Sequence, residues 1–280
     1  MRKISSDTVT QAVKKMCISA NCHIDPSIKN ALLNASNIET SETGKSVLLN
    51  LLKNAEIADK KEVPICQDTG MAVFFVEIGK EVYIEGDNLE KAIEKGVKEG
   101  YTDGYLRKSV VTDPLNRINT GDNTPPVIHY KFTDGDKLKI TFAPKGFGSE
   151  NKSAIKMLNP SDGRAGVVDF VLKTVRIAGA NPCPPMVIGV GIGGTFEKAA
   201  QLAKFALTRD INIHNENPFY AELEQELLEK INKLGIGPGG FGGNTTALGV
   251  NVEYFPTHIA GLPVAVNINC HATRHESVTI

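Results

Sequence analysis

The order of the apolar segments is the feature that most constrains how this chain folds. Up to about residue 60, apolar residues recur with helical spacing, and Val9, Val13, Met16 and Ala20 share one helix face. Beyond that point short apolar runs such as MAVFFVEIG and PMVIGV alternate with helical patterns. This order predicts a mixed α/β fold, with a helical N-terminal layer followed by β-sheets flanked by helices. We expect one domain over 1–280, mostly helical in 1–60 and mixed in 61–280.

Capping and turn residues mark several boundaries. Ser6 or Asp7 is expected to cap the first helix, and Asp25, with Pro26 in the first turn, to cap the second. Gly235 is expected to close the helix of PFYAELEQELLEKINKLG. The runs PVIHYKF and KLKITFAP flank Asp134-Gly135, which predicts a β-hairpin.

Composition excludes several classes of partner. A net charge of -1 gives no reason to expect nucleic acid or an anionic membrane as a partner. The apolar runs are too short to span a bilayer, and the N-terminus lacks the apolar core of a signal peptide. We therefore expect a soluble, cytoplasmic protein. Its five cysteines, an odd number, make a disulfide framework improbable and favour metal or catalytic roles.

Three of the cysteines share a context. Cys66, Cys183 and Cys270 each stand where an apolar strand meets a turn, in VPICQDTG, ANPCPPMVIGV and VNINCHATRH. Cys17 lies on the first apolar helix face and reads as a core residue, while Cys22 receives no role. The separations of 117 and 87 residues exclude a C-x-x-C pair. Three unrelated buried cysteines and one shared metal site therefore both stay open.

The neighbours of these cysteines suit a catalytic metal. Three thiolates on a [4Fe–4S] cluster leave one iron open, and an open iron is a Lewis acid that can hold a substrate oxygen. Gln67 and Asp68 follow Cys66 directly, and His258 lies 12 residues before Cys270. The segment KGFGSENK offers backbone N–H groups and a lysine that suit a carboxylate.

A glycine pattern supplies a rival hypothesis. Gly189, Gly191 and Gly194 match the dinucleotide fingerprint G-x-G-x-x-G, and Asp210 follows at about the expected distance. Asp210, however, continues a helical pattern instead of ending a second strand. A dinucleotide-binding oxidoreductase using the Gly189–Gly194 loop is thus a remote alternative. A non-catalytic iron–sulfur or zinc scaffold is another.

Five blocks in order carry a family resemblance. They are PICQDTGMAVFF, YLRKSVVTDPL, PKGFGSENKS, NPCPPMVIGVGIGGTFEKA and THIAGLPVAVNINCHATR. From about Glu56 onward the chain resembles the α-type domain of the iron–sulfur class I fumarate hydratases and L-tartrate dehydratases. The set is specific, although each block alone is weak.

The resemblance implies a site. It implies a [4Fe–4S] cluster on Cys66, Cys183 and Cys270, with one iron not bound by cysteine. It further implies that Asp68, partnered by His258, is the general acid. Four groups are expected to contact a dicarboxylate: Gln67, Arg107, and the backbone at Phe147 and Gly148.

The resemblance also implies a partner chain. Single-chain members of the family continue into a second domain that supplies the catalytic base, whereas this chain stops shortly after Cys270. We therefore expect an α subunit that needs a β subunit for the base and for further carboxylate-binding groups, assembled into a higher oligomer of αβ units. Reversible hydration of fumarate to (S)-malate is the preferred reaction, with L-tartrate dehydration as the alternative.

Overall fold

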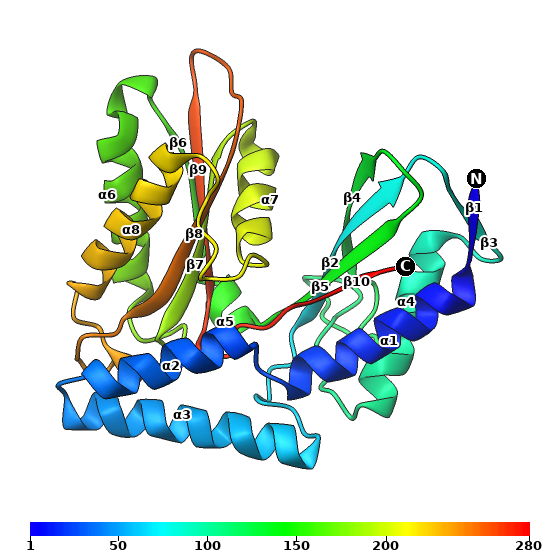
Figure 1. Ribbon diagram of the computed structural model, residues 1–280, viewed down its shortest axis with the longest axis horizontal. Coiled ribbons are helices and arrows are strands. Elements are labelled where there is room, and N and C mark those ends of the chain that lie inside the picture. Colours follow the sequence, from blue (N-terminus) through cyan, green and yellow to red (C-terminus); the bar gives the residue numbers. More distant parts are fainter. The chain divides into compact units, whose positions relative to one another are not determined.

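The computed structural model describes residues 1–280 and confirms a mixed α/β fold (Figure 1). Contacts group the chain into two compact units, each built from separate stretches. Unit 1 comprises 1–24, 55–147 and 274–280, and unit 2 comprises 25–54 and 148–273. The single-domain interpretation stays a prediction. No helix is long and apolar enough to cross a bilayer.

In unit 1, two helices pack on a four-stranded sheet of order β10-β5-β2-β4. Ser5 caps α1 (Ser6–Cys22), one residue earlier than predicted, and its expected apolar face is buried against α4 (Leu89–Asp103). The strands are β2 (Met71–Gly79), β4 (Val127–Thr133), β5 (Leu138–Lys145) and β10 (Glu276–Thr279). A parallel pair, β1 (Arg2–Ser5) with β3 (Val82–Glu85), completes the unit.

The predicted hairpin around Asp134-Gly135 is wrong, because β2 lies between its two strands. β2 pairs in parallel with β4 and antiparallel with β5. The turn crosses the end of β2 at Gly79, where a Cβ would lie 2.4 Å from the Gly135 carbonyl oxygen. β2 is the most apolar of the three strands and takes the buried central place, which a local turn signal does not reveal.

Unit 2 contains a second four-stranded sheet, of order β6-β9-β7-β8, with helices on both faces (Figure 1). Its strands are β6 (Ala154–Leu158), β7 (Met186–Gly193), β8 (Ala247–Phe255) and β9 (Leu262–Asn269). α6 (Gly163–Ala178) and α8 (Pro218–Asn232) cover one face, and α7 (Phe196–Ala206) covers the other. α8 ends three residues before the predicted Gly235.

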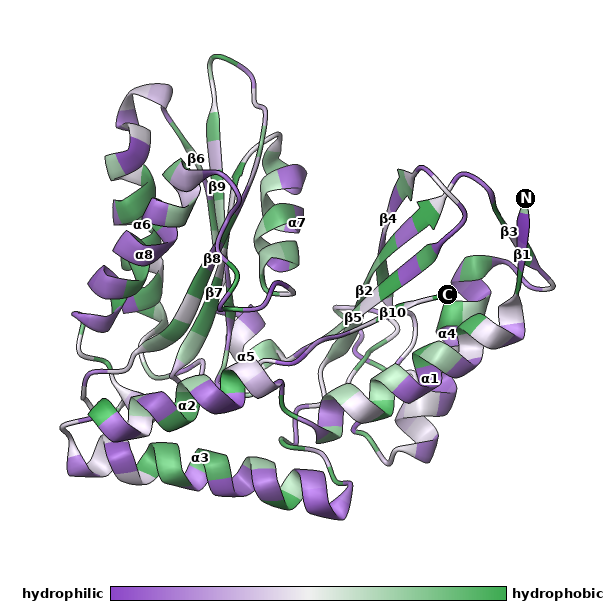
Figure 2. Cartoon of the chain, in the orientation of Figure 1, coloured by the Kyte–Doolittle hydropathy of each residue, from purple (hydrophilic) through white to green (hydrophobic).

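A helical pair and short helices complete unit 2. α2 (Pro26–Ile38) begins at the predicted cap Asp25, and α3 (Glu42–Lys61) follows it, with its last turns in unit 1. The short α5 (Phe147–Glu150), η1 (Pro160–Asp162) and η2 (Pro238–Gly240) lie in the connections. In Figure 2 the strands of the sheet are mostly hydrophobic, while the outer faces of its helices are hydrophilic. β7 is buried at every position, so it is the centre of this core.

Candidate active-site residues

The segment Cys66–Gly70 of unit 1 forms a turn just before β2. Cys66 is half-buried, and its thiol lies 3.3 Å from the Gln67 side-chain oxygen and 3.4 Å from the Asp68 backbone nitrogen. Gln67 is exposed. Gly70 has φ +76°, and a Cβ there would lie 2.7 Å from the Lys145 backbone nitrogen, so only glycine fits. The thiol, amide and carboxylate thus occupy one tight turn.

Two backbone N–H groups fix the carboxylate of Asp68. Gly70 donates to Oδ1 at 3.0 Å, and Phe147 donates to Oδ2 at 2.8 Å. A Cβ on Gly146 would lie 3.2 Å from Oδ2, so a side chain there would crowd the carboxylate. The predicted substrate role of the Phe147 backbone therefore needs qualification, because its N–H already binds Asp68. Gly148 has open space where a Cβ would stand.

Buried side chains hold three carbonyls of this turn. Tyr101 donates its hydroxyl to Thr69 at 2.8 Å, Asn123 donates its amide to Gly70 at 3.2 Å, and Arg274 donates Nη2 to Asp68 at 2.6 Å. All three donors are at most 5% exposed. Burial raises the pKa of Tyr101 well above its ordinary value, so its hydroxyl keeps its proton and donates. The Cys66–Gly70 turn is therefore rigidly held.

Arg107 lies beside this turn. Thr69 donates its hydroxyl to the Arg107 carbonyl at 3.0 Å, which fixes the backbone, while the guanidinium is exposed. An exposed guanidinium can bind a carboxylate bidentately. The competitor Arg117 instead reaches the Pro114 carbonyl in its own loop.

In unit 2, Cys183 and Cys270 lie at the same end of the sheet. β7 and β9 are antiparallel with Val187 opposite Asn269, so the residues before β7 and after β9 are neighbours. The backbone N–H of His271 donates to the Cys183 carbonyl at 3.3 Å, which joins the two loops. Cys183 is exposed and has φ +52°, a left-handed conformation that is uncommon for a non-glycine residue.

The glycine-rich segment before β8 supports the Cys183 loop. Gly239 donates its N–H to the Pro184 carbonyl at 2.8 Å. The buried carboxylate of Glu39, just after α2, accepts backbone N–H bonds from Ser41, Asn244 and Thr245. The segment is thus an ordered support for the cysteine loop, not a flexible connection.

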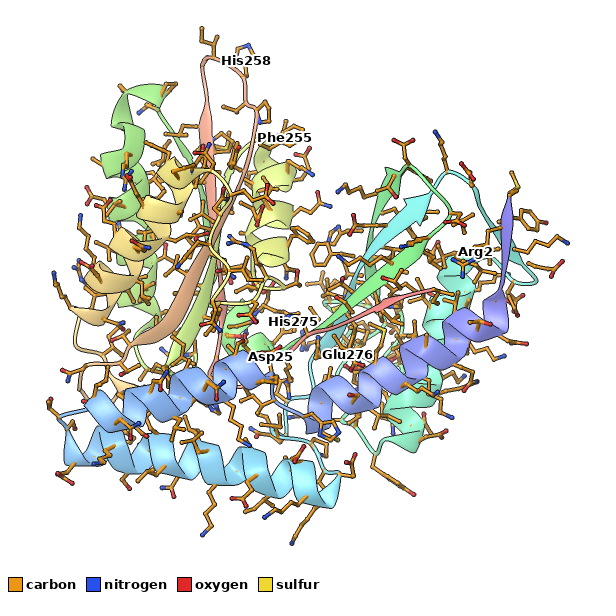
Figure 3. The ribbon with its side chains drawn as sticks, viewed as in Figure 1. Arg2, Asp25, Phe255, His258, His275 and Glu276 are labelled. Carbon is orange, nitrogen blue, oxygen red and sulfur yellow. The ribbon has the colours of Figure 1, made fainter.

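His258 lies at the opposite end of the same sheet from Cys270. It is exposed at the tip of the β8–β9 connection (Figure 3), and its Nδ1 accepts the Ala260 N–H at 3.2 Å. β9 separates His258 from Cys270. The first and last of its eight residues are about 23 Å apart, because they are separated by seven steps of roughly 3.3 Å. His258 also lines a cavity of about 360 Å³ together with Arg164 and Tyr220. One copy of unit 2 therefore does not bring His258 near its cysteines.

The structure brings together only part of the predicted site. Gln67, Asp68, Arg107 and Phe147 gather around Cys66 in unit 1, while Cys183 and Cys270 are paired in unit 2. No group of three or more His, Cys, Asp or Glu side chains stands ready to hold a metal ion. The three-thiol ligand set stays a prediction.

The chemistry of the thiols nevertheless fits a cluster. None of the five cysteines is in a disulfide, and the three predicted ligands are exposed or half-buried at turns. Cys17 and Cys22 are buried, and burial raises the pKa of both thiols, which disfavours the thiolate that binds iron. The five cysteines therefore separate into three accessible thiols and two buried ones; Cys17 is buried as predicted, whereas no role was predicted for Cys22.

The fingerprint glycines have a packing role. Gly189 and Gly191 lie inside β7, not in a loop at a helix N-terminus. A Cβ on Gly189 would lie 2.0 Å from the Ala203 carbonyl oxygen, and one on Gly191 2.1 Å from that of Ala199. These glycines let α7 approach the sheet, so the basis of the dinucleotide alternative disappears.

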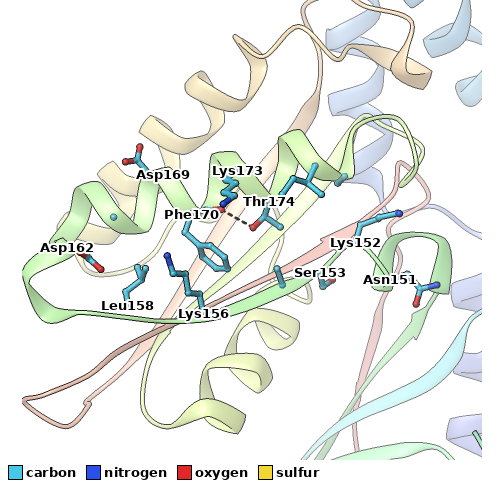
Figure 4. A pocket seen from close by; sticks show the side chains of 14 residues that line it. Asn151, Lys152, Ser153, Lys156, Leu158, Asp162, Asp169, Phe170, Lys173 and Thr174 are labelled. Atoms are coloured by element: carbon cyan, nitrogen blue, oxygen red, sulfur yellow. Dashed lines mark hydrogen bonds between the residues drawn. The ribbon is translucent and has the colours of Figure 1, made fainter.

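A larger cavity in unit 2 lies between β6 and α6 (Figure 4). Its volume is about 560 Å³, and Lys156, Asp169 and Lys173 are among its lining residues. None of the predicted site residues lines it. Asn151 and Lys152, at the end of the KGFGSENK segment, do line it, so the cavity adjoins that segment.

Sequence reasoning missed the residues that position the Cys66–Gly70 turn. Tyr101 and Asn123 are far from the turn in sequence, and Arg274 ends the block NCHATR without a predicted role. A buried tyrosine on an amphipathic helix gives no signal of its hydroxyl's partner. Only Arg274, as a charged residue inside a specific block, could have been identified.

The chain is similar to known proteins over nearly its whole length. Residues 10–279 match the family described as fumarate hydratase (fumerase). A protein of Methanocaldococcus jannaschii, provisionally named L(+)-tartrate dehydratase subunit alpha, is 44% identical over 96% of this chain and 95% of its own length. The L(+)-tartrate dehydratase subunit alpha of Escherichia coli K12 is 33% identical over 97% of this chain and 90% of its own.

Proposed function

The chain belongs to the fumarate hydratase family, and from that premise we propose that it is the α subunit of an iron–sulfur hydro-lyase that interconverts fumarate and (S)-malate. The observation that carries the proposal is the Asp68 carboxylate, fixed by two N–H groups beside the thiol of Cys66. A carboxyl group in a fixed position can donate the proton that a departing hydroxyl needs.

Cys66, Cys183 and Cys270 would hold a [4Fe–4S] cluster in this proposal. When bound, the cluster supplies a Lewis acid for the substrate hydroxyl at its iron without cysteine. Support comes from the turn positions and accessibility of these thiols, against the buried Cys17 and Cys22.

Residues of this chain would bind the substrate and protonate its leaving hydroxyl. Arg107 and Gln67, both exposed beside the turn, would hold the substrate carboxylates, and Gly148 offers an open backbone position. Asp68 would give a proton to the leaving hydroxyl and recover it in the reverse direction. The base that removes the carbon-bound proton would come from a β subunit, in line with the "subunit alpha" names of the relatives.

Pairing His258 with Asp68 has a consequence for assembly. If one cluster is shared by Cys66 and Cys270, Asp68 lies near Cys270, whereas His258 lies about 23 Å or more away along β9. His258 of one copy would then serve Asp68 of another. The proposal therefore includes at least two α subunits in the active assembly.

Mixing two inactive variants tests this pairing. Asp68→Asn and His258→Asn chains, unfolded and refolded together, should form mixed dimers in which one of two sites has both native residues. Random mixing should then recover about a quarter of wild-type activity. A mixture no more active than its components contradicts pairing between copies.

The substrate is tested directly. The relatives are named as L(+)-tartrate dehydratase subunits, so tartrate is the specific second candidate. Anaerobically prepared chain, with and without its cognate β chain, should be assayed on fumarate, (S)-malate and L-tartrate. We expect turnover only with both chains and fastest with fumarate. A higher kcat/KM for L-tartrate than for fumarate would make tartrate the assigned substrate. Full activity of the α chain alone would exclude a catalytic base on the β chain.

A further inference from the structure

Arg274 is a buried cation whose charge no ion pair balances. Its residue is 5% exposed, and its one hydrogen bond runs from Nη2 to the Asp68 carbonyl at 2.6 Å. Nε and Nη1 are buried without any acceptor. Burying a guanidinium with two unused donors costs free energy. A fold that keeps such a buried arginine therefore gains something from its positive charge.

The surroundings of Arg274 point to the Cys66–Gly70 turn. The carbonyl it binds belongs to Asp68, the residue that follows Gln67 and carries the candidate acid. Tyr101, on the neighbouring carbonyls, is neutral, as is Asn123. Arg274 is thus the one positive charge among the three side chains that hold this turn.

We propose that Arg274 is a positioning residue that locks the Cys66–Gly70 turn through the Asp68 carbonyl and adds a positive charge there that favours an anionic ligand. This inference rests on the proposed function for the identity of the ligand, a dicarboxylate. No carboxylate forms a salt bridge with the guanidinium, so its field acts on the turn and on charge bound there.

The positioning half is tested by hydrogen exchange on the full chain without cofactor. Arg274→Met keeps the apolar stem and removes the guanidinium, while Arg274→Lys keeps the charge and loses the planar fork. Amides of the peptide covering Cys66–Gly70 should exchange about tenfold faster or more in Arg274→Met, because a charge-assisted hydrogen bond is lost. Arg176→Met, at an exposed arginine of α6, is the matched control and should leave this peptide unchanged.

The electrostatic role proposed for Arg274 is tested by measuring how tightly the loaded αβ assembly binds succinate, an unreactive dicarboxylate. Its dissociation constant should rise about tenfold in Arg274→Met and clearly less in Arg274→Lys, because the lysine retains the attraction for a dianion. Unchanged exchange in Arg274→Met overturns the proposal. Faster exchange with unchanged succinate affinity overturns the electrostatic half and leaves a structural residue.

Failure of the proposed function has a different signature. In that case wild-type protein would neither bind succinate nor turn over fumarate or tartrate. The exchange comparison needs neither cluster nor substrate, so it decides the positioning role on its own.

Discussion

The Cys66 turn of unit 1 and the cysteine loops of unit 2 are held in different ways. Cys66–Gly70 depends on side chains from distant segments, with Tyr101, Asn123 and Arg274 donating to its carbonyls. Cys183 and Cys270 depend on strand register and backbone bonds, with His271 and Gly239 as donors. The first arrangement fixes one acid in orientation, whereas the second fixes two thiols at a sheet end. In the proposed function, unit 1 supplies Asp68 and the thiol of Cys66, and unit 2 supplies the thiols of Cys183 and Cys270.

The largest effect is expected from the acid of unit 1. Asp68→Asn keeps the shape of the side chain but cannot donate a carboxyl proton, so turnover should fall by about 10²–10⁴-fold. Iron content per chain should stay at the wild-type level. Steady-state rates divided by cluster content measure this. A variant within threefold of wild type would remove Asp68 from the mechanism.

In unit 2, the free energy of unfolding should be most sensitive to substitutions where α7 packs closely on β7. Gly189→Ala places a Cβ 2.0 Å from the Ala203 carbonyl oxygen, and relieving this overlap should lower the free energy of unfolding by about 1–3 kcal/mol or more. Urea denaturation measures the loss. Gly261→Ala, whose Cβ meets nothing closer than 4.0 Å, is the control and should change stability little.

Glu39 tests the support under the Cys183 loop. Burial opposes its ionisation, but N–H bonds from Asn244, Ser41 and Thr245 outweigh burial and lower its pKa in the folded state. Its contribution is therefore present above the unfolded pKa and lost as pH falls through the lower folded value. Glu39→Gln should cost about 1–2 kcal/mol at pH 7, and the difference from wild type should shrink below about pH 4. A pH-independent difference would contradict this reading.

Glu276 in unit 1 should show the opposite sign and the smallest effect. Burial raises its pKa, against a hydrogen bond from Ser19 and the charge of His23, which lower it. Ionised Glu276 therefore disfavours folding above its folded pKa, and this penalty fades as pH falls towards the unfolded value. Glu276→Gln should raise the free energy of unfolding at pH 7–8 by less than about 1 kcal/mol. Thermal unfolding at pH 5 and pH 8 measures the change, and a loss of stability at pH 8 would reverse the sign.

The same contrast explains what the sequence could predict. Helical periodicity and caps located α1 and α2 closely, because those signals are local. The hairpin failed because strand partners depend on which strand takes the buried centre. The short β6 and β10 were missed because four or five residues carry little pattern.

For the candidate site, the local sequence blocks identified the reactive side chains but not the residues that hold their turn in place. VPICQDTG placed Cys66 and Asp68 in one turn, as the structure shows. Nothing in the sequence linked Tyr101 or Arg274 to that turn, since their bonds form only through the fold. The family resemblance predicted His258 near Asp68. It could not show that β9 separates His258 from Cys270.

Iron and sulfide content per chain tests most directly whether the thiols of both units hold one cluster. After anaerobic reconstitution, wild-type chain should bind about four iron and four sulfide. Cys66→Ala, Cys183→Ala and Cys270→Ala should each lose most of both, whereas the buried Cys22→Ala should retain them. If Cys66→Ala keeps the full complement while Cys183→Ala loses it, unit 1 supplies no ligand and the shared cluster is contradicted.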